Sequence, residues 1–126
     1  FNTLIDTLGI VTSRDGSTKY LIQAPFLITN MDLNGVKVIS GGSFSRCTML
    51  QSITIAESVI SIGDRAFEYC GALNSVTMMS QVPPALGVDV FSGTSSALKI
   101  YVPQISIDTY KTAENWSVYA DKIIGY

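Results

Sequence analysis

The side chains of this chain that could carry chemistry are two cysteines, Cys47 and Cys70, and a close pair of carboxylates, Asp64 and Glu68. The chain contains no histidine. Serine and cysteine nucleophiles that rely on a histidine base are therefore excluded, as are histidine-based metal sites. No metal-ligand spacing and no calcium-loop pattern occurs either. We therefore predict a non-catalytic protein with no metal and no cofactor.

The two cysteines occupy matching positions in two similar segments, so two interpretations arise. They could form a disulfide or a thiol pair, because stacked positions lie near ~4.8 Å and a bridge is sterically conceivable. They could equally be small apolar residues that point into a core. Thr94 fills the same position in a third segment, which indicates that size matters more than thiol chemistry. We interpret both as reduced structural thiols.

Two further sets of residues have a functional and a structural interpretation. Asp64 and Glu68 could serve as a carboxylate pair for acid–base catalysis, or they could lie on a solvated turn with Arg65 between them. Trp116 and Tyr119 could form a platform that stacks on a sugar, or they could be buried on the apolar side of a helix. Asn115-Trp116-Ser117 also matches the glycosylation acceptor pattern. The structural interpretation is favoured in each case.

These residues are positioned by a sequence repeat. Residues 39–55 match residues 62–78 at an offset of 23 without a gap, and a third copy follows at an offset of 24 over residues 86–102. Such self-similarity is typical of solenoids, in which each unit buries its apolar face against its neighbours. The matching positions form six apolar or small columns. They are Ile39/Ile62/Leu86, Phe44/Phe67/Phe91, Cys47/Cys70/Thr94, Leu50/Leu73/Ala97, Ile53/Val76/Ile100 and Ile55/Met78/Val102.

The end of each copy alternates with period two, as in Ile53-Thr54-Ile55, which predicts a short strand with an exposed middle residue. Stacked copies would place these strands side by side in a narrow parallel sheet. Thr54, Thr77 and Tyr101 should then form a row on its exposed face, flanked by Gln51, Asn74, Lys99 and Met79. A second, weaker strand is expected before each copy, with its ladder ending or distorting near Pro83-Pro84.

We therefore predict a short, right-handed solenoid of about three turns with a cap at each end. Residues 1–30 are expected to form an N-terminal cap, with a short helix from the spacing of Phe1, Leu4, Ile5 and Leu8 and then a hairpin around Asp15-Gly16. Residues 31–103 hold the repeats, in units near 39–61, 62–85 and 86–103. Residues 104–126 are expected to form a helical cap. In this cap, Ser106 begins a helix whose apolar side carries Tyr110, Ala113, Trp116 and Tyr119.

Composition limits the partners. The net charge is −2 and no basic cluster occurs, which argues against nucleic acid. The chain is 47% hydrophobic, yet it lacks a run long enough for a membrane span, so we expect no membrane insertion. The start, Phe1-Asn2-Thr3-Leu4, resembles neither an initiator nor a signal peptide, so we expect a mature product or an excised fragment. We expect a monomer.

The repeats resemble the BspA-like leucine-rich repeat family. The resemblance rests on Ile62-Gly63-Asp64-Arg65-Ala66-Phe67-Glu68-Tyr69-Cys70, on Leu73-Asn74-Ser75-Val76-Thr77-Met78 and on Ser58-Val59-Ile60-Ser61. The ending Tyr101-Val102-Pro103, with Tyr110-Lys111 and Trp116, is similar to the closing cap of such proteins. The resemblance covers roughly residues 35–120. It implies a cell-surface or secreted bacterial protein that adheres to host extracellular proteins or to other bacteria, and it supplies no catalytic motif.

The combined expectation is a non-catalytic recognition or adhesion module that binds a protein, or a glycan, through the exposed face of the repeat sheet. Two alternatives remain open from the sequence. One is a structural spacer without a ligand of its own, which would tolerate changes at Thr54, Thr77 and Tyr101. The other is a carbohydrate-binding accessory domain, which would need exposed aromatic residues and carboxylates together, and Tyr101 is its one good candidate.

Overall fold

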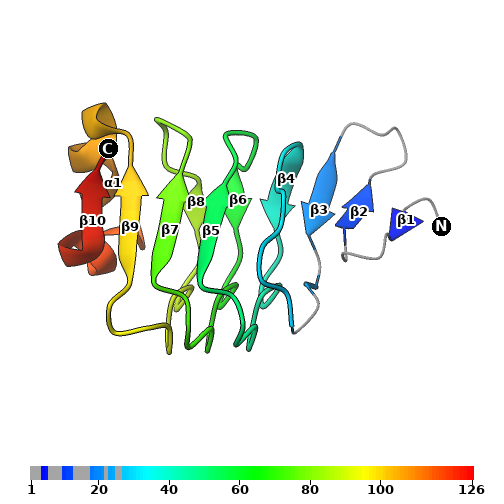
Figure 1. Ribbon diagram of the computed structural model, residues 1–126. Helices are drawn as coiled ribbons and strands as arrows, with labels where there is room; N and C mark the ends of the chain where they lie inside the picture. Colours follow the sequence, from blue (N-terminus) through cyan, green and yellow to red (C-terminus); the bar gives the residue numbers. More distant parts are fainter. Residues whose placement is uncertain (1–3, 6–9, 13–17, 22, 25–26) are drawn as a thin grey trace.

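Two β-sheets form the framework of the protein. The computed structural model describes residues 4–5, 10–12, 18–21, 23–24 and 27–126. Within these residues the strands assemble into a six-stranded sheet A, in the order β1-β2-β3-β4-β6-β8, and a four-stranded sheet B, in the order β10-β9-β7-β5 (Figure 1). The strands of sheet A are β1 (Leu4–Ile5), β2 (Ile10–Thr12), β3 (Lys19–Leu21), β4 (Val36–Ile39), β6 (Ser61–Ile62) and β8 (Ala85–Leu86). Those of sheet B are β5 (Ser52–Ile55), β7 (Ser75–Met78), β9 (Lys99–Val102) and β10 (Ile123–Gly125).

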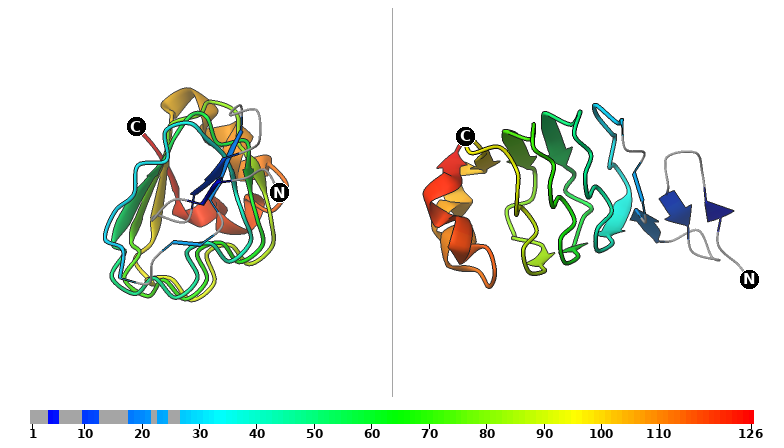
Figure 2. Two further views of the ribbon diagram at one scale, coloured as in Figure 1. Left: turned by 90° about the vertical axis from the view of Figure 1, so that its right-hand side faces the viewer. Right: turned by 90° about the horizontal axis from the view of Figure 1, so that it is seen from below.

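Sheet B is entirely parallel and follows the sequence repeat. Ile53 pairs with Val76 and Val76 pairs with Ile100, so each copy contributes one strand at the predicted period. The expected narrow parallel sheet is therefore confirmed. The sheet then gains β10 from the end of the chain, which pairs with β9 through Ile123 and Ile100. Seen along the stack, the traces of successive repeats nearly superimpose (Figure 2).

Sheet A contains the weaker second strand that the sequence indicated. Ile39 pairs with Ile62 and Ile62 with Leu86, all in parallel. The last of these strands, β8, directly follows Pro83-Pro84 and forms the edge of the sheet, which agrees with the expectation that the ladder ends there.

The N-terminal segment extends sheet A. The predicted hairpin is present as the antiparallel pair β2 and β3, while its central turn lies outside the described residues. The prediction of a short helix from Phe1, Leu4, Ile5 and Leu8 is wrong at Leu4–Ile5, which form β1. The rest of the predicted helix lies outside the described residues. Strand β1 pairs antiparallel with β2, and sheet pairing overrides a helical spacing in so short a segment. Strand β3 pairs in parallel with β4, so the segment expected to be a separate cap continues the repeat sheet.

The apolar columns lie in one core between the sheets. In five of the six columns every residue is buried except Thr94, which is half-buried. The exception is the column that pairs Leu50 and Leu73 with Ala97. Ala97 is exposed and Leu98 is buried instead, with its backbone N–H bonded to Ser95 O as that of Leu73 is bonded to Cys70 O. The spacing from Phe91 to Ile100 equals that from Phe67 to Val76, so the buried leucine stands one position later in a segment of unchanged length.

The phenylalanine column is a continuous stack of rings. The Phe67 centroid lies 4.7 Å from that of Phe44 and 5.6 Å from that of Phe91, with the ring planes within 14° of parallel. Tyr119 meets Phe91 edge-on at 5.2 Å, and Trp116 lies tilted at 6.5 Å from Phe91. The aromatic stack therefore runs from the repeats into the C-terminal segment and joins the two.

The backbones of adjacent repeats approach closely beside this stack. The N–H of Gly63 donates to Ile39 O at 2.7 Å, and the N–H of Gly87 donates to Ile62 O at 2.8 Å. A Cβ at position 63 would lie 2.4 Å from the backbone nitrogen of Gly41, and one at position 87 would lie 2.5 Å from that of Asp64. Both positions therefore require glycine because a neighbouring backbone fills the space of the side chain.

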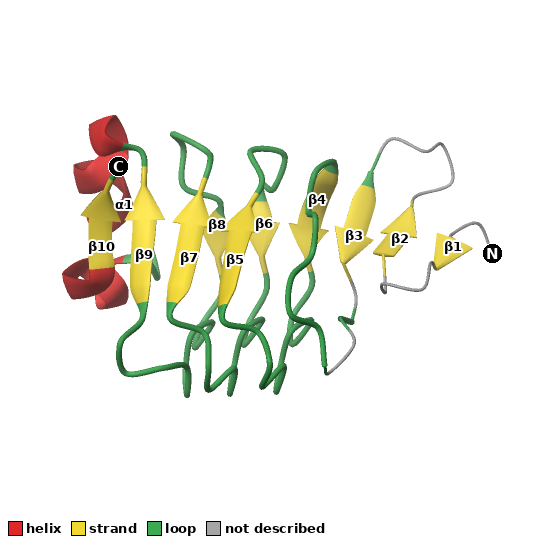
Figure 3. Cartoon of the chain, in the orientation of Figure 1, coloured by secondary structure: helices red, strands yellow, loops and turns green. Residues whose placement is uncertain are grey.

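The C-terminal segment is helical, although not as one helix. It comprises the 3-10 helix η1 (Gln104–Ser106), helix α1 (Ile107–Thr112) and the 3-10 helix η2 (Ser117–Lys122), which gather at one end of the stack (Figure 3). The single apolar helix side predicted through Trp116 and Tyr119 is wrong in this respect, because the chain becomes extended at Ala113 and Asn115 adopts a positive φ of 63°. Tyr110 and Trp116 are nevertheless buried, and Ala113 and Tyr119 pack against the core.

Side chains of this segment satisfy the last free carbonyl groups of the repeats. Tyr110 Oη donates to Ser80 O at 2.6 Å, Trp116 Nε1 to Pro84 O at 2.9 Å and Asn115 Nδ2 to Leu86 O at 2.7 Å. Ser106 occupies the N-cap position of α1 as predicted. Its hydroxyl, however, makes no cap hydrogen bond and donates to Gln81 O at 2.8 Å. Pro84 O and Leu86 O correspond to Ile60 O and Ile62 O, which accept N–H groups of the next repeat, so Trp116 and Asn115 take the place of a further repeat.

Tyr126 compensates for a proline in sheet B. After β7, the N–H of Met79 donates to Ile55 O, but the residue after β9 is Pro103, which has no N–H. Tyr126 Oη donates to Met78 O at 2.9 Å, while the backbone N–H of Tyr126 donates to Val102 O at 2.9 Å. The last residue of the chain therefore bonds both β7 and β9.

Both cysteines are buried in the core as thiols and are not joined by a disulfide. Cys70 Sγ donates to Phe44 O, the carbonyl of the preceding turn, at 2.9 Å. Burial raises the pKa of Cys47, and it raises that of Cys70 to about 12, with a hydrogen bond from the backbone of Cys47 opposing the shift. The thiols consequently remain protonated and act as packing groups.

Replacing Phe67 with alanine tests the aromatic stack. Phe67 is fully buried between two other rings, so its truncation should lower the free energy of unfolding by about 3–5 kcal/mol. Urea denaturation followed by circular dichroism measures the change. Ile60, which is 61% exposed, supplies the control, and Ile60→Ala should cost well under about 1 kcal/mol. Equal effects of the two substitutions would contradict the assignment of Phe67 to the core.

Replacing Tyr126 with phenylalanine tests the bond that compensates for Pro103. Loss of the hydroxyl leaves Met78 O without this donor and should cost about 1 kcal/mol of unfolding free energy. Tyr69→Phe is the matched control, since Tyr69 is 47% exposed, Tyr126 is 54% exposed, and only Tyr126 donates to a backbone carbonyl. An unchanged denaturation midpoint for Tyr126→Phe would show that the hydroxyl contributes nothing.

The thiols predict a loss of stability at alkaline pH. A thiol has a pKa near 9.0 without burial, whereas that of folded Cys70 is about 12. Above pH 9 the unfolded chain loses this proton and the folded chain keeps it, so stability is complete below pH 9 and declines as the pH rises toward 12. Urea midpoints measured from about pH 8 to about pH 10 should fall less in Cys47→Ser/Cys70→Ser than in the unaltered protein. Identical pH dependence would contradict buried, protonated thiols.

Candidate functional site

The outer face of sheet B brings together the residues predicted to bind a partner. The register pairs Thr54 with Thr77 and Thr77 with Tyr101, so the three lie side by side across the sheet. Thr54 is exposed, whereas Thr77 and Tyr101 are half-buried. Strand β10 extends the row, because Tyr101 pairs with Ile124, whose side chain is 40% exposed.

Two further rows run parallel to this one. Ser52 pairs with Ser75 and Ser75 with Lys99, which forms a row toward the start of the strands. The residue directly after each strand forms the third row, which contains Ala56, Met79, Pro103 and Tyr126. Met79 is 47% exposed, and its sulfur lies 3.8 Å from Tyr126 Oη.

Among the predicted flanking residues, Lys99 and Met79 lie within these rows. Gln51 and Asn74 are exposed one residue before β5 and β7, where Asn74 N–H donates to Gln51 O at 2.9 Å. Lys99 is in register with Ser75 and not with Asn74, so the predicted set spans two adjacent rows.

The chemistry of this face is nearly neutral. Lys99 is the one charged residue within the four strands of sheet B, and the other outward side chains are hydroxyls, an aromatic ring and an isoleucine. Serine and threonine offer short donors and acceptors, and tyrosine adds a rigid amphipathic contact. Such a face can form hydrogen bonds and bury a ring against a partner.

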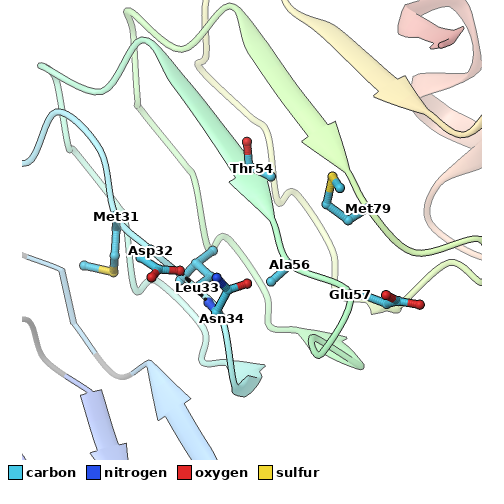
Figure 4. Close-up of a pocket in the computed structure, with 8 residues that line it drawn as sticks. All are labelled: Met31, Asp32, Leu33, Asn34, Thr54, Ala56, Glu57 and Met79. Atoms are coloured by element: carbon cyan, nitrogen blue, oxygen red, sulfur yellow. Dashed lines mark hydrogen bonds between the residues drawn. The ribbon is translucent and has the colours of Figure 1, made fainter.

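A hollow indents this face at its N-terminal end. It has a volume of about 300 Å³ and lies where the segment Met31–Asn34 meets the end of β5 (Figure 4). Ala56 is the small residue at its base, and Thr54, Glu57 and Met79 stand around it. Sequence reasoning identified Thr54 and Met79 but missed Asp32, Asn34, Ala56 and Glu57.

A signal for the missed residues was present in the sequence. Met31 and Leu33 are buried and Asp32 between them is exposed, which is the same pattern as Ile53-Thr54-Ile55. Met31-Asp32-Leu33 therefore resembles one more copy of the strand, although it lacks strand pairing. An additional, degenerate copy at this position would have placed Asp32 beside Thr54.

The other candidate groups have structural roles. Asp64 Oδ1 accepts a hydrogen bond from Val88 N–H at 2.9 Å, whereas Glu68 lies 3.6 Å from Arg65, so the two carboxylates engage different partners. Trp116 is 1% exposed and cannot present its ring to a sugar. Within the part of the chain that the structure describes, no group of three or more metal-ligating side chains occurs, and no helix is long and apolar enough to cross a membrane.

Comparison with known proteins supports the repeat assignment. A comparison with curated proteins finds none that matches the chain significantly. The family model described as "BspA type Leucine rich repeat region (6 copies)" matches residues 23–114, which is most of the chain. The match begins before the three clear copies and includes Met31–Leu33. The chain therefore belongs to the BspA-type leucine-rich repeat family.

Proposed function

We propose that this chain is a non-catalytic recognition module of a bacterial surface or secreted protein, and that it binds a protein partner through the outer face of sheet B. Leucine-rich repeat domains typically mediate protein interactions, and those of the BspA type are often found at the cell surface or in secreted proteins. The stacked copies act as a short, right-handed solenoid of about three turns, closed at each end by its terminal segments. It acts as a monomer.

The observation that carries the proposal is the register of Thr54, Thr77 and Tyr101 on an accessible, nearly uncharged face. Interfaces are depleted in charge at their centre and enriched in tyrosine. Extended faces of repeat proteins are their usual binding surfaces. In sheet A the repeats contribute β6 and β8, which have two residues each, whereas β5, β7 and β9 of sheet B have four.

A protein partner fits this face better than a glycan does. Tyr101 is the one aromatic residue within the strands of sheet B, and the strands contain no carboxylate. A sugar site would need several stacking rings and polar groups at one position. Extracellular proteins of a host are the expected partners, as the family membership suggests.

Changing the central row to aspartate tests the proposed function. Thr54→Asp/Thr77→Asp/Tyr101→Asp adds three adjacent negative charges and removes the ring, so a partner retained from serum, extracellular-matrix extract or mucin should be lost. Affinity should fall by more than about 100-fold, because a central tyrosine alone commonly contributes more than about 2 kcal/mol to binding. Affinity capture followed by titration of the captured partner measures the loss.

A second triple variant controls for charge and stability. Thr48, Ser96 and Thr109 are exposed and lie outside sheet B, so changing them to aspartate should leave binding intact. Both variants must show an unaltered circular dichroism spectrum. Equal retention by all three proteins would place the site elsewhere, and no retention by any of them would favour a structural spacer.

A further inference from the structure

The hollow beside β5 has a shape that suits a single side chain. In the third row, Ala56 is 8% exposed and stands next to the long side chain of Met79, so the surface drops between Met79 and Asn34 (Figure 4). The volume of about 300 Å³ is at the lower limit for small-molecule sites, and the hollow is open to solvent. Its size and position therefore fit one projecting group of a partner that covers the sheet face.

The charge of the hollow is negative. Asp32 and Glu57 lie to either side of Ala56, and none of the described residues that line the hollow is a lysine or an arginine (Figure 4). The ion pairs among the described residues join Arg65 to Glu68 and to Asp89, so they do not neutralise these two carboxylates. Lys19 reaches Gly35, next to the hollow, but does not line it.

Asp32 is held in place before any partner arrives. Its Oδ1 accepts a hydrogen bond from the backbone N–H of Asn34 at 2.9 Å, which fixes the carboxylate at the rim. The side chains of Asp32 and Asn34 are both exposed, so the remaining acceptor sites of the Asp32 carboxylate are accessible to a partner. Little conformational freedom would therefore be lost at Asp32 on binding.

The remaining walls are apolar. Ala56 and the flexible thioether of Met79 can contact the methylene groups of a long side chain, and methionine adapts well to such contacts. Lysine and arginine combine an aliphatic stem with a cationic end. A neutral aliphatic side chain would leave the carboxylates unpaired, and an acidic one would be repelled.

We propose that this hollow receives a lysine or arginine side chain of the protein that binds sheet B. The stem lies against Ala56 and Met79, and the cation pairs with Asp32 at the rim, while Glu57 adds negative charge on the other side of Ala56. The inference rests on the proposed function. It also sets the orientation of the partner on sheet B, because the partner must place a basic residue at the N-terminal end of the face. The rest of the face, where Lys99 is the one charge within the strands, lacks such a preference.

Methyl NMR with short peptides tests this site without the unidentified partner. The protein is labelled at alanine and methionine methyl groups and titrated with Gly-Ser-X-Ser-Gly, in which X is lysine, arginine, norleucine or glutamate. The lysine and arginine peptides should shift the Ala56 and Met79 methyl signals, and the norleucine and glutamate peptides should not. Equal shifts with norleucine, or no shift with any peptide, would overturn the proposal.

Neutral isosteres distinguish the local effect of the two carboxylates from attraction by the net charge of the protein. Asp32→Asn/Glu57→Gln preserves the Asp32 acceptor and should weaken the lysine and arginine peptides about three- to tenfold. Glu114→Gln/Asp121→Asn makes the same change in charge at exposed positions of the C-terminal segment and should have no effect. An equal loss in both variants would show attraction by net charge alone and overturn the site.

The outcome is distinguishable from failure of the proposed function. Peptide binding that persists in Asp32→Asn/Glu57→Gln would remove the basic-residue pocket, even if the aspartate triple variant loses its protein partner. Conversely, specific peptide binding alongside a partner that the aspartate triple variant retains would support the pocket and contradict the Thr54, Thr77 and Tyr101 row as the main contact.

Discussion

Every other feature of this structure depends on the close stacking of one repeat on the next. Gly63 and Gly87 allow the backbones to approach, hydrogen bonds such as Gly63 N–H to Ile39 O join them, and Phe67 fills the interior between two other rings. A repeat of this size cannot bury its apolar face alone. Because the stacking fixes the register, it also fixes which side chains are adjacent on the outer face of sheet B.

The ends of the stack must satisfy the groups that another repeat would have bonded. At the C-terminal end, Tyr110, Trp116 and Asn115 donate to backbone carbonyls, and Tyr126 supplies the donor that Pro103 lacks. Buried polar groups without partners are costly. The aromatic residues of this segment therefore combine packing against Phe91 with hydrogen bonding, which explains why Trp116 is buried and not displayed.

The repeated part of the fold could be predicted from sequence because matching columns record stacking directly. The strand alternation at Ile53-Thr54-Ile55 and the offset of 23 residues were enough to place Thr54 beside Thr77. The predictions that failed concern residues outside the clear copies, or a position at which one copy departs from the other two. Leu4–Ile5 form a strand because β2 supplies a pairing edge, and in the third copy the buried leucine stands at position 98 while Ala97 is exposed.

Only part of the candidate site could be predicted from the sequence. The central row follows from the repeat, but the hollow depends on a single small residue, Ala56, beside a degenerate copy around Asp32. Asp32 precedes the three clear copies and Glu57 follows a strand, so only the three-dimensional structure shows that both line one hollow. The outer face of sheet B is therefore nearly neutral along its strands and acidic at one end.

The most direct test of the recognition face is photo-crosslinking from within it. A benzoylphenylalanine placed at Tyr101 and, in a separate protein, at Tyr69 is irradiated with serum or matrix extract, since Tyr69 is exposed on a turn outside sheet B. Binding through sheet B predicts a defined adduct from position 101 that is absent from position 69. The same adduct from position 69 alone, or from both positions equally, would contradict sheet B as the binding surface.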